Sequence, residues 1–120
     1  MPGPTYAVVL AEEEGVTIVR FRARLVTESE YLSQVYEELS EFAETIGGKT
    51  ILSLEGVEAI SSAGLSALFW FSEQLRSLGG ELRVCDASPF LRDILKTAHL
   101  DEFLQIHETK ADALKAFECS

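Results

Sequence analysis

Hydrophobic and polar residues alternate near the start of the chain in the way that β-strands require. The runs 6–11 and 16–25 are rich in β-branched and aromatic residues, and residues 12–15 between them end in a glycine, which is typical of a hairpin loop. Within the second run, arginines at every other position from 20 to 24 alternate with apolar residues. The two runs are therefore predicted to be antiparallel neighbours, with the arginines facing solvent.

The next segment has apolar residues at three- and four-residue spacing, which places them on one face of an α-helix. These residues are Leu32, Val35, Tyr36, Leu39, Phe42, Ala43 and Ile46. Thr27 and Glu30 resemble a capping box at the start of the helix, and Gly47-Gly48 can supply the left-handed residue that ends it. This pattern predicts the first helix of the protein.

Strands and helices alternate along the rest of the chain. The runs 50–54, 81–85 and 103–106 predict strands, of which the first is expected to be central and buried. Apolar residues from Leu65 to Leu78 predict a second helix that stops at Gly79-Gly80.

Two more helices are indicated by their capping residues. Ser88-Pro89 is an N-cap followed by proline at the first helical position, and Thr109 with Asp112 resembles a capping box for a terminal helix. The order β-β-α-β-α-β-α-β-α then predicts a single α/β domain over residues 1–120. Its mixed central sheet would have about five strands, accompanied by about four helices.

Composition limits the classes of partner. The 120 residues are 47% hydrophobic, which suits one compact domain with one core. Ten Lys and Arg against twenty Asp and Glu give a net charge of -10. Because nucleic acids and anionic membranes are themselves negative, neither is expected as a partner.

Cysteines and histidines show no metal-ligand spacing. Cys85 and Cys119 lie far apart and are expected to be free thiols, one of them buried, and His99 and His107 are assigned no role. No cofactor is expected. The chain start lacks a basic region followed by an apolar stretch, and no apolar run approaches the ~20 residues of a membrane span, so a cytoplasmic protein is predicted.

The segment from Leu54 to Leu65 carries the candidate chemistry, because it places two serines, Ser61 and Ser62, at the start of a helix. Several short segments follow one another at characteristic spacing. They are the strand 51–54, Gly56-Val57, the Ser-x-Gly-Leu of 62–65, the Gly79-Gly80 helix end and the Leu-x-Val strand after it. This pattern resembles anti-sigma-factor antagonists of the STAS family, and the resemblance covers most of the chain.

The resemblance implies a binding protein, with no enzymatic activity, that acts in a partner-switching pathway regulating transcription. In that family a serine at this helix start is phosphorylated by a kinase that is also the anti-sigma factor, and by position that serine is Ser62. Helix starts favour such a group, because unpaired N–H groups and the helix dipole can hold a phosphate. Serine is equally a favoured N-cap of any helix, and capping is compatible with phosphorylation.

This sequence departs from the family pattern at two positions. Ser53 stands where the strand usually carries an aspartate, and Ser61 stands where an acidic residue precedes the acceptor. Ser61 is thus an alternative acceptor. A missing carboxylate also removes repulsion that would oppose a neighbouring phosphate.

The partner-binding surface is predicted to include Ser61, Ser62, Ala63, Gly64, Ser66 and Trp70. Helical spacing places Trp70 on the polar face of its helix. Two interpretations of this tryptophan stay open: an interface anchor beside Ser62, or a ring folded over a hydrophobic edge or a neighbouring chain.

Two other classes of function are considered. A small serine hydrolase would need the motif Gly-x-Ser-x-Gly, and the segment 59–64 lacks its first glycine. A non-switching scaffold, in which the domain forms a homo-oligomer or an assembly with related domains, fits the missing carboxylates.

Overall fold

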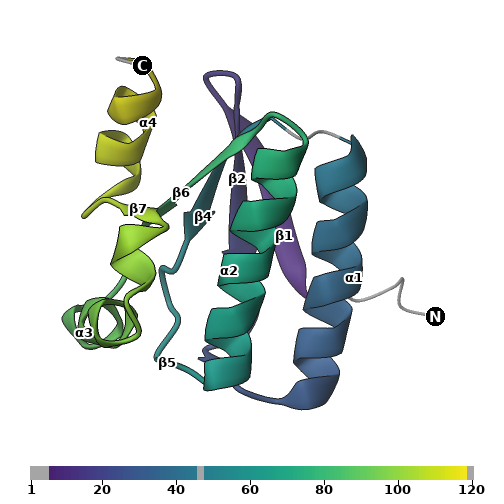
Figure 1. The fold of residues 1–120 in the computed structure, drawn as a ribbon, viewed down its shortest axis with the longest axis vertical. Coiled ribbons are helices and arrows are strands. Elements are labelled where there is room, and N and C mark those ends of the chain that lie inside the picture. Colours follow the sequence, from purple (N-terminus) through teal and green to yellow (C-terminus); the bar gives the residue numbers. More distant parts are fainter. Residues whose placement is uncertain (1–5, 46–47, 119–120) are drawn as a thin grey trace.

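The computed structural model describes residues 6–45 and 48–118, and these form a five-stranded sheet with helices on both faces (Figure 1). The sheet has the order β1-β2-β4-β6-β7. Its strands are β1 (Val8–Glu13), β2 (Val16–Phe21), β4 (Lys49–Ser53), β6 (Glu81–Cys85) and β7 (Gln105–Ile106). The helices are α1 (Ser29–Thr45), α2 (Ser62–Ser77), α3 (Pro89–Thr97), α4 (Lys110–Glu118) and the short 3₁₀ helix η1 (Leu100–Glu102). A separate pair of parallel strands consists of β3 (Leu25–Val26) and β5 (Ala59–Ile60).

The predicted fold class is confirmed. β1 and β2 form an antiparallel hairpin, while β2, β4, β6 and β7 run parallel, so the sheet is mixed. The predicted strand 81–85 has the observed bounds of β6, and β4 begins one residue earlier than expected. The arginines at positions 20, 22 and 24 are exposed, as expected.

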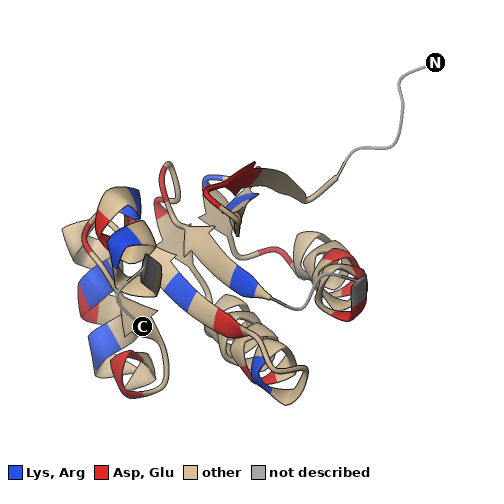
Figure 2. Ribbon diagram, turned by 90° about the horizontal axis from the view of Figure 1, so that it is seen from above, with Lys and Arg blue, Asp and Glu red and all other residues tan. Residues whose placement is uncertain are grey.

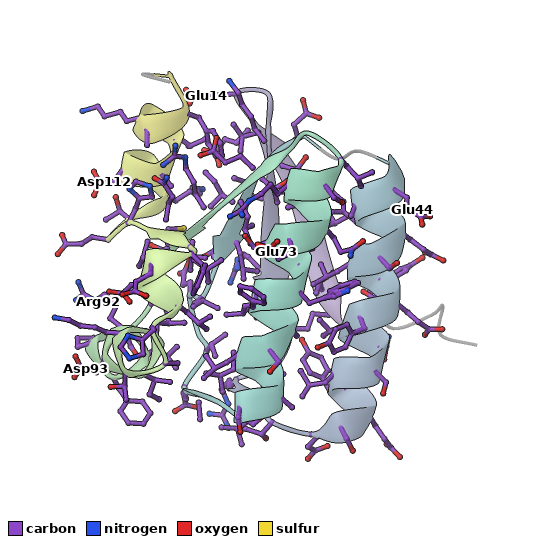
Figure 3. All side chains as sticks on the ribbon, in the orientation of Figure 1. Glu14, Glu44, Glu73, Arg92, Asp93 and Asp112 are labelled. Carbon is purple, nitrogen blue, oxygen red and sulfur yellow. The ribbon has the colours of Figure 1, made fainter. Side chains whose placement is uncertain are left out.

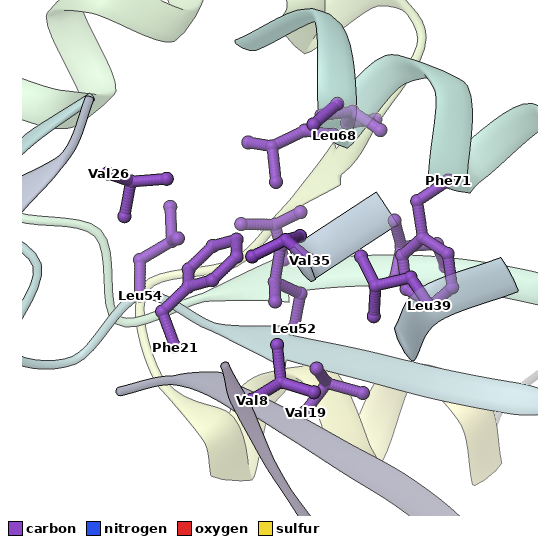
Figure 4. Packing of buried hydrophobic residues seen from close by; sticks show 14 of the residues in the cluster. Val8, Val19, Phe21, Val26, Val35, Leu39, Leu52, Leu54, Leu68 and Phe71 are labelled. Atoms are coloured by element: carbon purple, nitrogen blue, oxygen red, sulfur yellow. The ribbon is translucent and has the colours of Figure 1, made fainter. Parts of the chain in front are cut away.

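Two hydrophobic clusters lie on opposite faces of the sheet. The larger one fills the space between the sheet and the adjacent helices α1 and α2, where Val35, Leu39, Leu52, Leu68 and Phe71 are completely buried (Figure 4). The smaller one lies under α4 and consists of Val16, Ile18, Ile51, Cys85, Ala113, Leu114 and Phe117. The predicted buried free thiol is therefore Cys85, whereas Cys119 lies outside the described residues.

Four local predictions differ from the structure. The first strand, expected over 6–11, is β1 over 8–13, because Glu12 and Glu13 pair with Thr17 and Val16 and leave only two residues in the turn. The second strand ends at Phe21, and Leu25 and Val26 leave the main sheet to pair with β5. The predicted strand 103–106 shortens to β7, because Phe103 closes the turn after η1 by donating its N–H to the Leu100 carbonyl. α1 begins at Ser29, so the capping box expected at Thr27 is not the start of the helix.

Three other helix ends follow the predicted capping chemistry, whereas Ile46 and Gly47, at the expected end of the first helix, lie outside the described residues. The Ser88 hydroxyl accepts from the Leu91 N–H at 3.2 Å, and the Thr109 hydroxyl accepts from the Asp112 N–H at 3.1 Å. Gly79, with a φ of 84°, ends α2 in the left-handed region.

The outer surfaces of the helices carry charged side chains, and Glu44, Glu73 and Asp93 are labelled examples (Figure 3). Among the described residues, no helix has the length and apolarity to cross a bilayer.

A buried arginine connects α4 to the sheet. Arg83 on β6 contacts the carboxylate of Glu81 at 2.8 Å, the Gln105 side chain at 2.7 Å and the His107 ring at 3.1 Å. Its guanidinium also lies 4.8 Å from the centre of the Phe117 ring. Burial, together with this guanidinium, lowers the pKa of His107 from its ordinary value, although Asp112 opposes the shift.

The histidine generates a pH-dependent contribution to stability. Because the folded protein disfavours the charged ring, the unfolded chain binds the proton more readily, and this contribution is lost as the pH falls below about 6.5. His107→Gln should therefore reduce the loss of stability between about pH 7 and pH 5, measured by urea unfolding at each pH. Parallel pH curves for the two proteins would contradict this expectation.

Candidate functional site

The candidate site is the loop that joins β5 to α2, and a small piece of sheet holds it in place. Val26 and Ile60 are partners in the β3–β5 pair, and the Ser61 N–H donates to the Val26 carbonyl at 3.0 Å. The Glu58 N–H donates to the Arg24 carbonyl at 2.7 Å, and the two side chains form an exposed ion pair at 3.3 Å. The start of α2 is thus fixed by backbone hydrogen bonds to the chain segment that precedes α1.

The two serines at this helix start have different surroundings. Ser61 is the N-cap: its hydroxyl accepts from the Gly64 N–H at 3.2 Å and lies 3.5 Å from the Val26 carbonyl, to which it can donate. Ser62, the first residue of α2, is exposed. The capping interpretation is confirmed for Ser61, and the accessible hydroxyl belongs to Ser62.

A glycine allows α2 to approach this small sheet closely. A β-carbon built on Gly64 would lie 2.5 Å from Cγ1 of Ile60 and 2.8 Å from the Val26 carbonyl oxygen. Gly64 is itself buried, so its contribution to the predicted surface is to position the loop. Ala63 and Ser66 are exposed on the same helical turns as Ser62.

Trp70 is only partly exposed and packs against the helix beside it. Its ring lies 4.8 Å from that of Tyr36 on α1, and both rings border the main hydrophobic cluster. The structure therefore shows the ring folded over a hydrophobic edge, the second of the two interpretations. A role in partner binding stays a prediction.

An apolar surface adjoins Ser62, between α2 and the segment that contains α3 and η1. Two depressions of about 440 and 340 Å³ lie there, and Leu65 lines both of them. Phe90 and Phe103 are 60% and 50% exposed, and Phe69 contacts Phe103 edge to face at 5.3 Å. This surface was not predicted, because its residues come from three elements that only the fold brings together.

Ser53 and Cys85, on the paired strands β4 and β6, both contact the carboxylate of Asp86. The buried hydroxyl of Ser53 donates to the Asp86 carboxylate at 2.9 Å and accepts from the Glu55 N–H at 3.3 Å. The Cys85 thiol lies 3.3 Å from the same carboxylate oxygen. The acid that the family pattern places at position 53 is thus matched by an acid from the end of β6.

The thiol of Cys85 is protonated at neutral pH. Burial, with the adjacent Asp86 carboxylate, raises the pKa of Cys85 to about 12. Because the thiolate is the reactive form, Cys85 is inert at neutral pH. Within residues 6–45 and 48–118, no group of three or more His, Cys, Asp or Glu side chains is placed to hold a metal ion.

No described interaction joins either histidine to Ser61 or Ser62. His107 contacts Arg83, and the His99 ring lies 4.0 Å from the Glu102 carboxylate. Each described contact of the Ser61 hydroxyl is with the backbone. The described interactions therefore give no support to a serine hydrolase.

Comparison with known proteins connects this geometry with a family. The family model for the STAS domain matches residues 7–113, which include the whole site. The chain belongs to the STAS domain family. This STAS domain is 27% identical over 93 residues to BtrV of Bordetella bronchiseptica, which carries the provisional description of an anti-sigma factor antagonist. The match covers 78% of this chain and 80% of BtrV.

Solved structures share the fold of this STAS domain. An anti-sigma-factor antagonist STAS domain protein from Planctomyces limnophilus superposes with a TM-score of 0.79 and 25% identity, over 91% of this chain and 96% of that one. SpoIIAA, a Bacillus cell fate determinant solved in its phosphorylated form, has a TM-score of 0.66 and 16% identity, over 92% and 99% of the chains. The latter similarity concerns the fold alone.

The contact at Gly64 predicts a stability effect. Gly64→Ala should destabilise the STAS domain by about 1–3 kcal/mol, although alanine is the better helix former, because the backbone carbonyl of Val26 cannot move aside easily. Urea unfolding measures the change, with Ser66→Ala as the exposed control, expected to stay within about 0.5 kcal/mol. An unchanged or increased stability for Gly64→Ala would show that the loop relaxes freely.

The shared carboxylate predicts a coupling between two positions. Ser53→Asp alone should destabilise the fold by more than about 1 kcal/mol, because it buries a second carboxylate against Asp86. Adding Asp86→Asn should recover much of the loss, since an amide can donate to the new acid. A double-mutant cycle by urea unfolding measures this coupling, with Asp86→Asn alone as the control. Strictly additive effects would contradict it.

Proposed function

We propose that this STAS domain is an anti-sigma-factor antagonist that binds a kinase-type anti-sigma factor through the start of α2, and that phosphorylation of Ser62 ends the binding. The observation that carries the proposal is the exposed Ser62 hydroxyl on the first turn of α2, next to a capping serine whose hydroxyl is occupied. The names of the relatives support the class of partner.

The apolar surface beside Ser62 would supply the binding energy. Exposed Phe69, Phe90 and Phe103 offer large areas to a partner, and aromatic anchors commonly dominate interface energetics. Leu65 and Ser66 connect this surface to the helix start. A partner that covers the surface would also cover Ser62.

A phosphate at Ser62 would change this interface through its charge. It adds about -1.5 to -2 charge at neutral pH, which a partner must either pair or desolvate. The first-turn N–H of Gly64 donates to Ser61, whereas the described hydrogen bonds give no acceptor to the N–H groups of Ser62 and Ala63. These two groups could hold the phosphate against the helix start.

Two substitutions at Ser62 test the switch. Ser62→Asp should weaken capture of the anti-sigma factor by roughly tenfold or more, whereas Ser62→Ala should preserve binding and abolish labelling by the kinase from ATP. Titration of purified partner by calorimetry and radiolabel transfer are the measurements. Equal binding by both variants would count against the switch.

The acceptor is assigned by a matched variant. Ser61→Ala should keep the label on Ser62 while costing about 1 kcal/mol of stability through the lost cap. If Ser61→Ala abolishes labelling and Ser62→Ala does not, the alternative acceptor Ser61 is correct.

The alternative function is a non-switching scaffold. It is favoured by Ser53 and Ser61 in place of the family's acids, whereas Trp70, which packs on Tyr36, gives it little support. Size-exclusion chromatography separates the two: a large assembly without labelling favours the scaffold, and a monomer that captures the anti-sigma factor favours the antagonist.

A further inference from the structure

The outer edge of the sheet is a second surface with a distinct chemistry. β1 is hydrogen-bonded to β2 on one side and lies at the end of the strand order, opposite β7. α3 and η1, which line the apolar surface beside Ser62 together with α2, lie near the opposite edge of the sheet, where η1 contacts β7 (Figure 1). Binding at β1 would therefore leave the Ser62 surface open.

The backbone of β1 offers hydrogen-bonding groups to an added strand. The Arg22 N–H donates to the Ala7 carbonyl, and the register pairs Val9 with Arg20 and Ala11 with Ile18. Alternation along an antiparallel pair then turns the N–H and C=O groups of Leu10 and Glu12 away from β2. Among the described residues, no strand pairs with these groups, so they form the outer edge of the sheet.

The beginning of this edge is held in place by a carboxylate from α1. Glu38 accepts hydrogen bonds from the N–H groups of Ala7, at 2.7 Å, and Val8, at 3.1 Å. The hydroxyl of Tyr31 donates to the Ala7 carbonyl. An added strand would therefore meet an edge that is already ordered, which lowers the entropic cost of binding.

Side chains along the edge form an apolar depression of about 530 Å³. It is lined by Tyr6, Val8, Val9, Leu10 and Phe42, with Arg22, Glu38 and Glu41 at the same site. Tyr6 is 56% exposed and Leu10 is 47% exposed. Such a depression can receive alternate apolar side chains of an extended peptide.

Charge indicates which peptide would bind. α1, which lies beside the edge, contains five glutamates and no lysine or arginine (Figure 2). β1 itself ends with Glu12 and Glu13, of which Glu13 is paired with Lys110 at 2.8 Å, and Glu14 follows in the turn. With a net charge of -10, a second copy of this chain would be repelled. A segment that alternates basic and apolar residues would match both the acids and the depression.

We propose that the β1 edge binds an extended basic segment of a partner protein, which adds to the sheet as a sixth strand. Backbone groups of Leu10 and Glu12 would supply the strand hydrogen bonds, and the depression around Leu10 would take apolar side chains. The proposal is independent of Ser62 and of the antagonist function, because it rests on a different edge of the sheet.

The test uses the full chain and a nine-residue peptide of alternating lysine and valine, with a fluorescent label. Fluorescence anisotropy should show saturable binding that weakens as salt rises. A version N-methylated at every peptide bond keeps the charges and side chains and loses the backbone donors, and its affinity should fall at least tenfold. Hydrogen exchange of the ¹⁵N-labelled chain should show new protection at Leu10 and Glu12.

A matched pair of variants locates the site. Leu10→Lys should weaken peptide binding at least tenfold, because it places a charge in the depression. Leu78→Lys adds the same charge at a residue that is 49% exposed at the end of α2, and it should change the affinity less than twofold.

Several results would overturn the proposal. Equal binding of the N-methylated peptide would show general electrostatic attraction, and protection confined to other strands would place the site elsewhere. Absence of binding by both peptides would show that the acids only protect the edge. Concentration-dependent self-association that is abolished by Leu10→Lys would assign the edge to a second copy of the chain.

Discussion

The close contact between the start of α2 and the β3–β5 pair determines the geometry of the candidate site. At this contact a glycine is needed, because any β-carbon would meet the Val26 carbonyl oxygen at 2.8 Å and Ile60 at 2.5 Å. The contact brings Ser61 to Val26, where its hydroxyl caps the helix, and leaves the next residue pointing outward. Displacing α2 by the width of one methyl group would therefore disturb the close contact, the Ser61 cap and the exposure of Ser62 together.

Elements with a long, regular pattern were predictable from the sequence, and so were helix ends set by neighbouring residues, except for the start of α1. The apolar spacing of α1 gave its position, and Ser88 and Thr109 cap within three residues of themselves. β3 and β5 were missed because a two-residue strand has no periodicity and gains its stability from pairing across 34 residues. Phe103 looked like a strand residue, but the turn after η1 decided its conformation.

The candidate site was predictable to a similar degree. The sequence placed both serines at a helix start, and only the fold distinguished the capping hydroxyl of Ser61 from the exposed Ser62. The carboxylate of Asp86 could not be foreseen, because it lies 33 residues from Ser53 and meets it only when β4 and β6 pair. The aromatic surface around Phe69 and Phe103 likewise depends on how α2 and η1 pack.

Because the hydroxyl of Ser61 is already hydrogen-bonded, a modification of the neighbouring Ser62 would alter the surface of the loop and leave its cap unchanged. Since Ser61 supplies the cap and Ser62 the accessible hydroxyl, a group added to Ser62 would leave the oxygen that caps the helix in place. Both forms of the molecule would then keep the same backbone. A partner would then distinguish the two forms by the charge and the size of the added group at the surface, with no refolding of the loop.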